Sequence, residues 1–192
     1  MPGKQTASSA KIIRIALLFE GSLVGVALGL GWLFSYPPFA QFLLSWQGGI
    51  RGLLATLPPL LVVLIASQLD YLPIKGLFRL SRERVATLFS GASLLDIALI
   101  SCMAGIGEEA LFRGVIQMAL VTELTPLTGI VIASLLFGLV HFISLTYALF
   151  ATLFGLYLGW LLFSFDNLLV PIVTHTVYDF IVLACLVCRR SG

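Results

Sequence analysis

Residues 94–120 read LLDIALISCMAGIGEEALFRGVIQMAL, and this stretch decides the fold class. A transmembrane helix needs about 20 mostly apolar residues, and the stretch is long enough for one. Two adjacent carboxylates, Glu108 and Glu109, and one guanidinium, Arg113, interrupt its apolar sequence. Because charged side chains are rare and costly inside a membrane, these three positions are the first candidates for a functional site.

The composition of the whole chain also indicates a membrane protein. Of its 192 residues, 59% are hydrophobic and only 10% are charged, and the mean hydropathy is +1.08. Soluble domains contain about 25% charged residues. These values argue against a soluble enzyme, a disordered chain and a nucleic-acid-binding protein. Three cysteines are too few for a disulfide scaffold. Membrane lipid is therefore an expected partner, and nucleic acid is not.

Six apolar runs are predicted to span the membrane, and they cover residues 12–34, 51–70, 94–120, 128–143, 146–164 and 168–188. Lipid offers no hydrogen-bond partner to free backbone groups, so helices are the expected form. The fold class is predicted to be all-α, a polytopic membrane helical bundle with about six transmembrane helices. We expect the first run to be a retained signal anchor, because it is longer than the apolar part of a cleavable signal. The third run is expected to be kinked or broken at Gly105 and Gly107.

Basic residues gather in three segments that an even number of spans places on one side of the membrane. They are Lys4, Lys11 and Arg14; Lys75, Arg79, Arg82 and Arg84; and Arg189 and Arg190. The positive-inside rule makes this side the cytoplasm, so both termini are predicted to be cytoplasmic. Within the middle segment, apolar residues recur at helical spacing over 74–89, which predicts an amphipathic helix at the membrane surface.

Ionisable side chains inside the predicted spans concentrate in the C-terminal half of the chain. They are Glu108, Glu109, Arg113, His141, His175 and Asp179. Glu109 and Arg113 are four residues apart and share a helical face, as do His175 and Asp179. Glu108 points about 100° away from Glu109. The set indicates one site formed by three helices.

Two kinds of chemistry fit a carboxylate and two imidazoles below the membrane surface. A carboxylate removed from bulk water can act as a base near neutral pH and take a proton from an attacking water. Imidazoles can then donate hydrogen bonds to the oxyanion that develops. Alternatively, Glu108, His141 and His175 could bind zinc and leave one coordination position open for a water.

Three ordered motifs resemble those of a known family. Glu108 to Arg113 reads E-E-x-x-x-R, Phe137 to His141 reads F-x-x-x-H, and His175 to Asp179 reads H-x-x-x-N/D. This trio resembles the CPBP (Abi) family of intramembrane proteases, relatives of the type II CaaX prenyl endopeptidase. The resemblance covers about residues 94–188, and the first two spans share with the family only their apolar character.

The resemblance implies a helical-bundle endopeptidase with its catalytic site inside the membrane. Glu108 would be the water-activating base, and Glu109 and Arg113 would support it. His141 would orient the water or the oxyanion, and His175 with Asp179 would complete the site. The family was long described as metalloproteases. We favour a glutamate mechanism without a cofactor and keep zinc as the alternative.

The chain departs from the prenyl proteases in two respects. About eight spans are expected in the eukaryotic members, against six here. Asp179 stands where they tend to have Asn, and a carboxylate donates a hydrogen bond only when it is protonated. This residue could instead orient His175 or bind a metal.

The sequence as a whole predicts an intramembrane endopeptidase that cleaves a membrane-associated protein or peptide, with prenyl-cysteine substrates not expected. We expect residues 1–93 to form an N-terminal part and residues 94–192 the catalytic core. A bacterial inner membrane is the expected location, and no particular oligomer is predicted. Two alternatives remain, a non-catalytic membrane binding or immunity protein and a proton-coupled transporter. Glu20, within the first span, has no predicted role beyond a polar contact inside the bundle.

Overall fold

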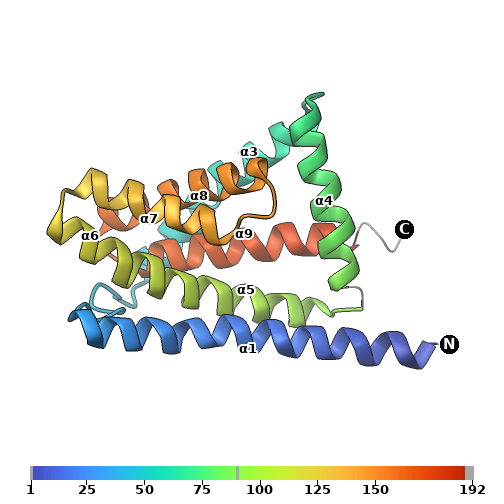
Figure 1. Cartoon of the computed structure of the whole chain (residues 1–192), viewed down its shortest axis with the longest axis horizontal. Coiled ribbons are helices and arrows are strands. Elements are labelled where there is room, and N and C mark those ends of the chain that lie inside the picture. The colour runs from blue at the N-terminus through green and yellow to red at the C-terminus, as the bar shows by residue number, and fades with distance from the viewer. Residues whose placement is uncertain (1, 90, 189–192) are drawn as a thin grey trace.

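The computed structural model describes the backbone of residues 2–89 and 91–188, with side chains at 10–81, 83, 88–89 and 91–187. Helices are the regular elements of this part of the chain, so the all-α prediction is confirmed. In chain order they are α1 (Pro2–Phe34), α2 (Trp46–Ala55), α3 (Leu57–Gln68), α4 (Leu72–Leu88), α5 (Leu94–Glu109), the π-helix η1 (Ala110–Gln117), α6 (Met118–Glu123), α7 (Pro126–Val140), α8 (Leu145–Phe165) and α9 (Leu169–Cys188) (Figure 1).

Four of the predicted spans correspond to helical stretches that are long and apolar enough to cross a membrane. These are Ala10–Phe34, Trp46–Gln68, Leu145–Phe165 and Leu169–Val187. The helix α7 is apolar but has only 15 residues, and the stretch from α5 to α6 contains the charged site residues. The chain is therefore a multi-pass helical membrane protein, while the count of six spans stays a prediction.

The third predicted span departs from regular α-helical geometry at a different place from the one expected. The helix continues through Gly105 and Gly107, and it turns into a π-helix only after Glu109. A Cβ at Gly105 would collide with Thr176 of α9, and one at Gly107 would collide with the backbone of Glu20 in α1. The glycines thus allow two neighbouring helices to approach α5 closely. Short π-segments within α-helices are frequent at functional sites.

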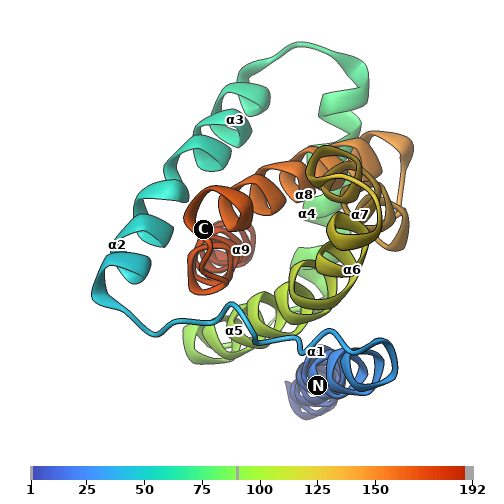
Figure 2. The ribbon, with the colours of Figure 1, turned by 90° about the vertical axis from the view of Figure 1, so that its left-hand side faces the viewer.

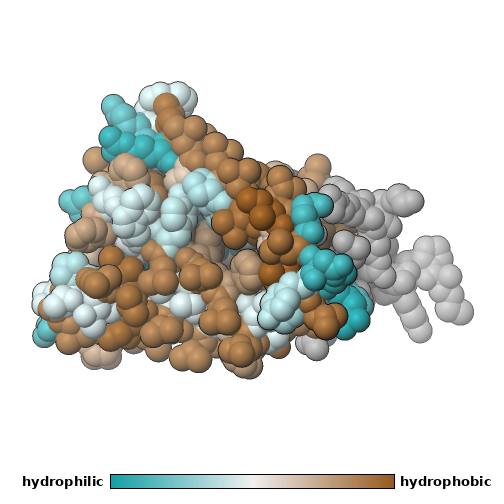
Figure 3. Space-filling model, turned by 90° about the horizontal axis from the view of Figure 1, so that it is seen from above, coloured by the Kyte–Doolittle hydropathy of each residue, from teal (hydrophilic) through white to brown (hydrophobic). Residues whose placement is uncertain are grey.

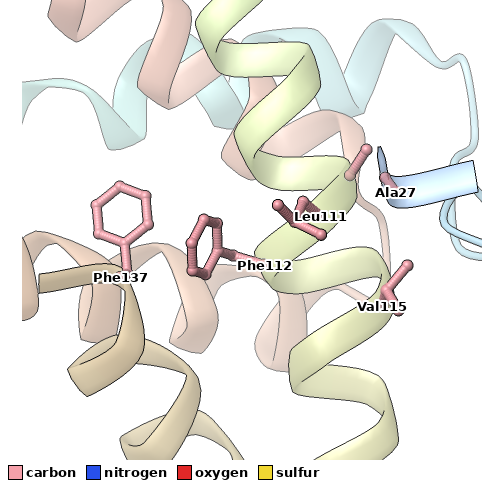
Figure 4. Close-up of a cluster of buried hydrophobic side chains, with 6 residues drawn as sticks. Ala27, Leu111, Phe112, Val115 and Phe137 are labelled. Atoms are coloured by element: carbon pink, nitrogen blue, oxygen red, sulfur yellow. The ribbon is translucent and has the colours of Figure 1, made fainter. Parts of the chain in front are cut away.

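The widened helix η1 lies between α1 and α7 and is packed on both sides. Val115 points toward Ala27 of α1, whereas Phe112 points toward Phe137 of α7, and Leu111 belongs to the same buried cluster (Figure 4). The Phe112 and Phe137 rings meet edge to face with centroids 5.1 Å apart, which is a favourable aromatic geometry. This cluster holds the start of η1, and therefore Glu108 and Glu109, in place.

The helix α9 runs through the middle of the bundle and packs against α5, α2 and α8 (Figure 2). Its start is held by the buried side chain of Asn167. Asn167 Oδ1 accepts hydrogen bonds from the backbone N–H groups of Leu43 (3.1 Å) and Leu169 (3.0 Å), and its Nδ2 donates to the Leu43 carbonyl (2.9 Å). The connection between α1 and α2 is thereby tied to the turn that precedes α9.

The helix α4 runs across the long helices, at the end of the bundle where α1 begins and α9 ends (Figure 1). This placement agrees with the predicted surface helix over 74–89. The first two predicted basic segments therefore lie at one end. The third, Arg189 and Arg190, and the side chains of Lys4, Arg82 and Arg84 lie outside the described residues.

The outer surface has the character of a membrane protein. On the face in Figure 3, apolar side chains cover most of the middle, and hydrophilic side chains gather toward the ends. Large apolar residues such as Leu18 and Trp32 in α1 are more than two-thirds exposed. Lipid is the natural neighbour of such a surface.

Candidate active site

The structure brings all six predicted site residues together from four elements. Glu108 and Glu109 are the last residues of α5, and Arg113 lies in η1. His141 directly follows α7. His175 and Asp179 lie one turn apart on α9.

Glu109 is held by hydrogen bonds to one of its two carboxylate oxygens, and the other oxygen, Oε2, is buried without a partner. Its Oε1 accepts from Arg113 Nη1 (3.2 Å) and from His175 Nδ1 (2.8 Å). Arg113 Nη2 donates to the carbonyl of Gly155 in α8 (3.0 Å). The side chains of Glu109 and Arg113 are 0% and 1% exposed. This pair therefore links α5, η1, α8 and α9 and fixes the orientation of the His175 ring.

Glu108 has different surroundings, although it is the adjacent residue. Its Oε2 lies 3.6 Å from His141 Nε2 and 4.0 Å from His175 Nε2. This oxygen is buried and has no hydrogen-bond partner. Both imidazoles thus present the same ring nitrogen to one carboxylate oxygen, at distances that leave the oxygen available to another group.

The hydrogen bonds at the far sides of the two rings determine where their protons lie. His141 Nδ1 lies 2.8 Å from the carbonyl oxygen of Phe137, which can only accept. His175 Nδ1 likewise lies 2.8 Å from an acceptor, the Oε1 atom of the Glu109 carboxylate. Each Nδ1 is therefore a donor, and each Nε2 can also donate only when the ring bears both protons.

Aromatic rings hold the two imidazoles from the side. The Phe137 ring lies 4.4 Å from the His141 ring and 6.1 Å from the His175 ring, measured between centroids. Phe154 of α8 meets the His175 ring edge to face at 5.4 Å. The guanidinium of Arg113 lies 4.5 Å from the Phe137 ring centroid, within the range of a cation–π contact. The phenylalanine of the F-x-x-x-H motif thus contacts three site residues.

Asp179 lies next to His175 rather than next to Glu108. Its Oδ2 is 3.5 Å from His175 Nε2, and its side chain is 29% exposed. This geometry agrees with an orienting contact to His175, one of the two roles that the sequence left for a carboxylate here.

A cavity of about 300 Å³ opens beside these residues. Its walls are mainly apolar and aromatic and come from α3, α8 and α9, with the site residues on one side. The lining includes Pro58, Pro59, Val62, Val63, Tyr147, Phe150, Phe154, Tyr157 and Tyr178, together with Glu108, His141, His175 and Asp179. Its size and lining are typical of a pocket for a small apolar group.

The described residues contain no group of three or more His, Cys, Asp or Glu side chains that could hold a metal ion. The zinc alternative at Glu108, His141 and His175, and with it the description as a metalloprotease, therefore has no support from the arrangement of these side chains.

The sequence did not assign one residue that the structure places at this site. Glu20 of α1 lies against α5 at Gly107, directly before Glu108. It interacts electrostatically with Glu108 and Asp179. A carboxylate within the first apolar run was the only signal that could have indicated it.

Comparison with known proteins concerns the region that contains the site. Residues 90–181, slightly less than half of the chain, match the model of the Rce1-like family, described as type II CAAX prenyl endopeptidase Rce1-like. All six candidate residues lie within the matched range. No curated protein and no solved structure matches the chain.

Proposed function

Because the chain belongs to the Rce1-like family of type II CAAX prenyl endopeptidases, we propose that it is an intramembrane endopeptidase in which Glu108 activates the attacking water. The family implies a protease in the membrane and a membrane-associated peptide substrate. The glutamate mechanism and the roles of the residues go beyond the family match.

One observation supports the glutamate mechanism most directly. Glu108 Oε2 is buried without a hydrogen-bond partner, and Glu108 lines the cavity. Two imidazole Nε2 atoms lie 3.6 and 4.0 Å from this oxygen. A carboxylate oxygen with a free lone pair beside space for a peptide can accept a proton from a water in that space.

The reaction then follows in two steps. Water attacks the carbonyl carbon of the peptide bond while its proton passes to Glu108, and the carbonyl oxygen becomes an oxyanion. The Nε2–H groups of doubly protonated His141 and His175 donate hydrogen bonds to this oxyanion. Glu108 next gives its proton to the amide nitrogen, the C–N bond breaks, and an amine and a carboxylic acid leave without any acyl-enzyme.

The remaining site residues position these groups. Glu109 accepts from His175 Nδ1, and Arg113 keeps Glu109 in place. Asp179 Oδ2 lies 3.5 Å from His175 Nε2, and its negative charge favours the doubly protonated ring. We propose that Asp179 orients this ring and does not itself donate to the oxyanion.

The test is a comparison of protein N-termini in cells that contain equal amounts of wild-type or Glu108→Gln protein. The proposal expects new N-termini that appear only with the wild type, and these would identify the substrate. Glu123→Gln makes the same chemical change at an exposed residue outside the site and should retain cleavage.

Identical termini in all three strains, with any cellular phenotype retained in Glu108→Gln, would contradict the proposal and favour a binding or immunity protein. Proton-dependent solute uptake by vesicles that contain the purified protein would instead favour a transporter.

Metal content distinguishes the two protease mechanisms. The glutamate mechanism expects cleavage by the purified protein to survive chelation. Roughly one zinc per chain, lost together with activity on chelation and restored by added zinc, would contradict the metal-free mechanism.

A further inference from the structure

Tyrosines line one side of the cavity, and their hydroxyl groups are used differently. Tyr157 donates a hydrogen bond of 2.8 Å to the Ala55 carbonyl, which ties α8 to the end of α2. The hydroxyls of Tyr147 and Tyr178 have no hydrogen-bond partner among the described residues. The proposed mechanism uses neither of them. Two neutral O–H donors are therefore available to a molecule in the cavity.

Tyr147 is the one of these two whose ring contacts a proposed catalytic group. Its ring centroid is 6.4 Å from that of His141, and His141 Nε2 lies 3.6 Å from Glu108 Oε2. The ring of Tyr178 instead packs on Phe154, with centroids 4.5 Å apart. Tyr147 therefore lies next to a side chain that the mechanism places at the attacked carbonyl group.

The start of α8 holds Tyr147 in this position. Ser144 Oγ accepts a hydrogen bond from the Tyr147 N–H (3.1 Å) and so caps the helix. The connection from His141 to Ser144 is short, and α7 packs closely on α8, since a Cβ at Gly138 would collide with Thr152. The backbone therefore positions the Tyr147 ring, and its hydroxyl is not needed to hold it there.

The charges at the site make a neutral donor useful. Asp179 lines the cavity, and its Oδ2 lies 3.5 Å from His175 Nε2. An ionised carboxylate accepts hydrogen bonds but donates none. Its negative charge also repels an oxyanion that forms nearby. A hydroxyl group opposes this repulsion, because it donates to the oxyanion without changing the charge of the site.

We propose that Tyr147 is a further catalytic residue, whose hydroxyl donates a hydrogen bond to the oxyanion that forms when water attacks the peptide carbonyl. It acts together with the Nε2–H groups of His141 and His175. The proton stays on the tyrosine, and the hydrogen bond strengthens as negative charge develops on the carbonyl oxygen. This inference rests on the proposed protease function.

The first test measures cleavage of the substrate identified from the new N-termini by purified variants that each lack one tyrosine hydroxyl. Tyr147→Phe should lower kcat about 10²-fold and change KM less than about threefold, because the lost hydrogen bond exists mainly in the transition state. Its Tm should equal that of the wild type, since the hydroxyl has no partner within the described part of the chain.

Two other tyrosines provide the comparison. Tyr71 is 60% exposed and lies between α3 and α4, away from the cavity, so Tyr71→Phe should cleave like the wild type. Tyr178→Phe removes the other unpaired hydroxyl from the cavity wall and should lower kcat less than Tyr147→Phe does. A kcat of Tyr147→Phe close to that of the wild type would overturn the proposal. A decrease in kcat that is as large in Tyr178→Phe would also overturn it.

A binding measurement keeps this inference independent of cleavage. The probes are two blocked dileucines in which a phosphinate, –P(O)(OH)–CH2–, or an ethylene group, –CH2–CH2–, replaces the amide bond. The phosphinate oxygens imitate the oxyanion, whereas the ethylene group cannot accept a hydrogen bond. The wild type should bind the phosphinate more tightly than the ethylene probe. Tyr147→Phe should raise the Kd of the phosphinate about tenfold or more and leave that of the ethylene probe within about threefold.

The binding results decide the role of the hydroxyl. Equal affinities of the wild type for both probes would overturn the proposal. An equal loss of affinity for both probes in Tyr147→Phe would overturn it as well, because that is what a role in packing would produce. If only the phosphinate is weakened but no N-termini depend on Glu108, the protease function fails while Tyr147 remains a donor to an anionic oxygen in the cavity.

Discussion

The two faces of the α5–η1 stretch differ in how completely their polar groups are paired. On one face, Glu109 Oε1 binds both Arg113 and His175 while its Oε2 has no hydrogen-bond partner, and all three side chains are at most 4% exposed. On the other face, Glu108 Oε2 is buried near two imidazoles and has no hydrogen-bond partner. The paired face joins helices, and the unpaired face lines the cavity. Two adjacent residues therefore have different roles: Glu109 holds helices together, and Glu108 is the proposed base. Mutations at the two faces should have different consequences.

The largest expected effect is the loss of catalysis in Glu108→Gln. The amide cannot accept the proton of the attacking water, so cleavage should fall about 10²–10⁴-fold. The Tm should stay close to that of the wild type, because Oε2 has no hydrogen bond to lose. Rate measurements with the purified protein and thermal unfolding check both parts. A rate within a few-fold of the wild type would remove Glu108 as the base.

Replacement of Arg113 by methionine should mainly reduce stability. It leaves Glu109 as a buried carboxylate without its cation, which costs about 3–5 kcal/mol in the free energy of unfolding. The double variant Arg113→Met with Glu109→Gln should recover part of this loss, because no buried charge remains unpaired. Equilibrium unfolding of the single and double variants measures the coupling. Additive losses would show that the two side chains do not act as a pair.

Replacing each histidine should distinguish effects on the cleavage rate from effects on stability. His141→Ala and His175→Ala should each slow cleavage about 10²-fold if each loses one hydrogen bond to the oxyanion. His175→Ala should also lower the Tm, since the fully buried Glu109 loses a hydrogen bond of 2.8 Å, whereas His141 makes its hydrogen bond to a backbone carbonyl, that of Phe137. An equal decrease in Tm for both variants would mean that the paired face does not depend on His175.

The smallest expected effect lies at the far end of α5. Ser93 caps this helix because its Oγ accepts a hydrogen bond from the Asp96 N–H, and the Ser93 N–H donates one to Asp96 Oδ2. Ser93→Ala should cost about 1 kcal/mol of stability. Cleavage should not change, because the cap is far from both faces. A marked loss of cleavage would indicate that the position of Glu108 depends on the start of α5.

Several features of the site could be predicted because they depend on local geometry. Residues four apart share a helical face, so the pairs Glu109 with Arg113 and His175 with Asp179 followed from spacing alone. Both pairs are present, with distances of 3.2 and 3.5 Å. The different direction of Glu108, about 100° around the helix from Glu109, followed from the rotation per residue.

Other features depend on which helices become neighbours. Gly105 and Gly107 suggested a break in the third span, but the structure uses them for close contact with α9 and α1. The change to a π-helix occurs instead over Ala110–Gln117, a stretch without proline whose single glycine, Gly114, did not predict it. Glu20 could not be assigned for the same reason, because its place beside Glu108 results from the packing of α1 on Gly107.

The sequence by itself determined that the chain is a helical membrane protein and which six residues belong together, because hydropathy and helical spacing act within single segments. Only the tertiary structure decided which of two adjacent glutamates is paired and which faces the cavity. It also decided that a carboxylate from the first helix joins the site. The physical reason is that the partners of Glu108, Glu109 and Glu20 come from helices far apart in the chain, and only the packing of the bundle brings them within interaction distance.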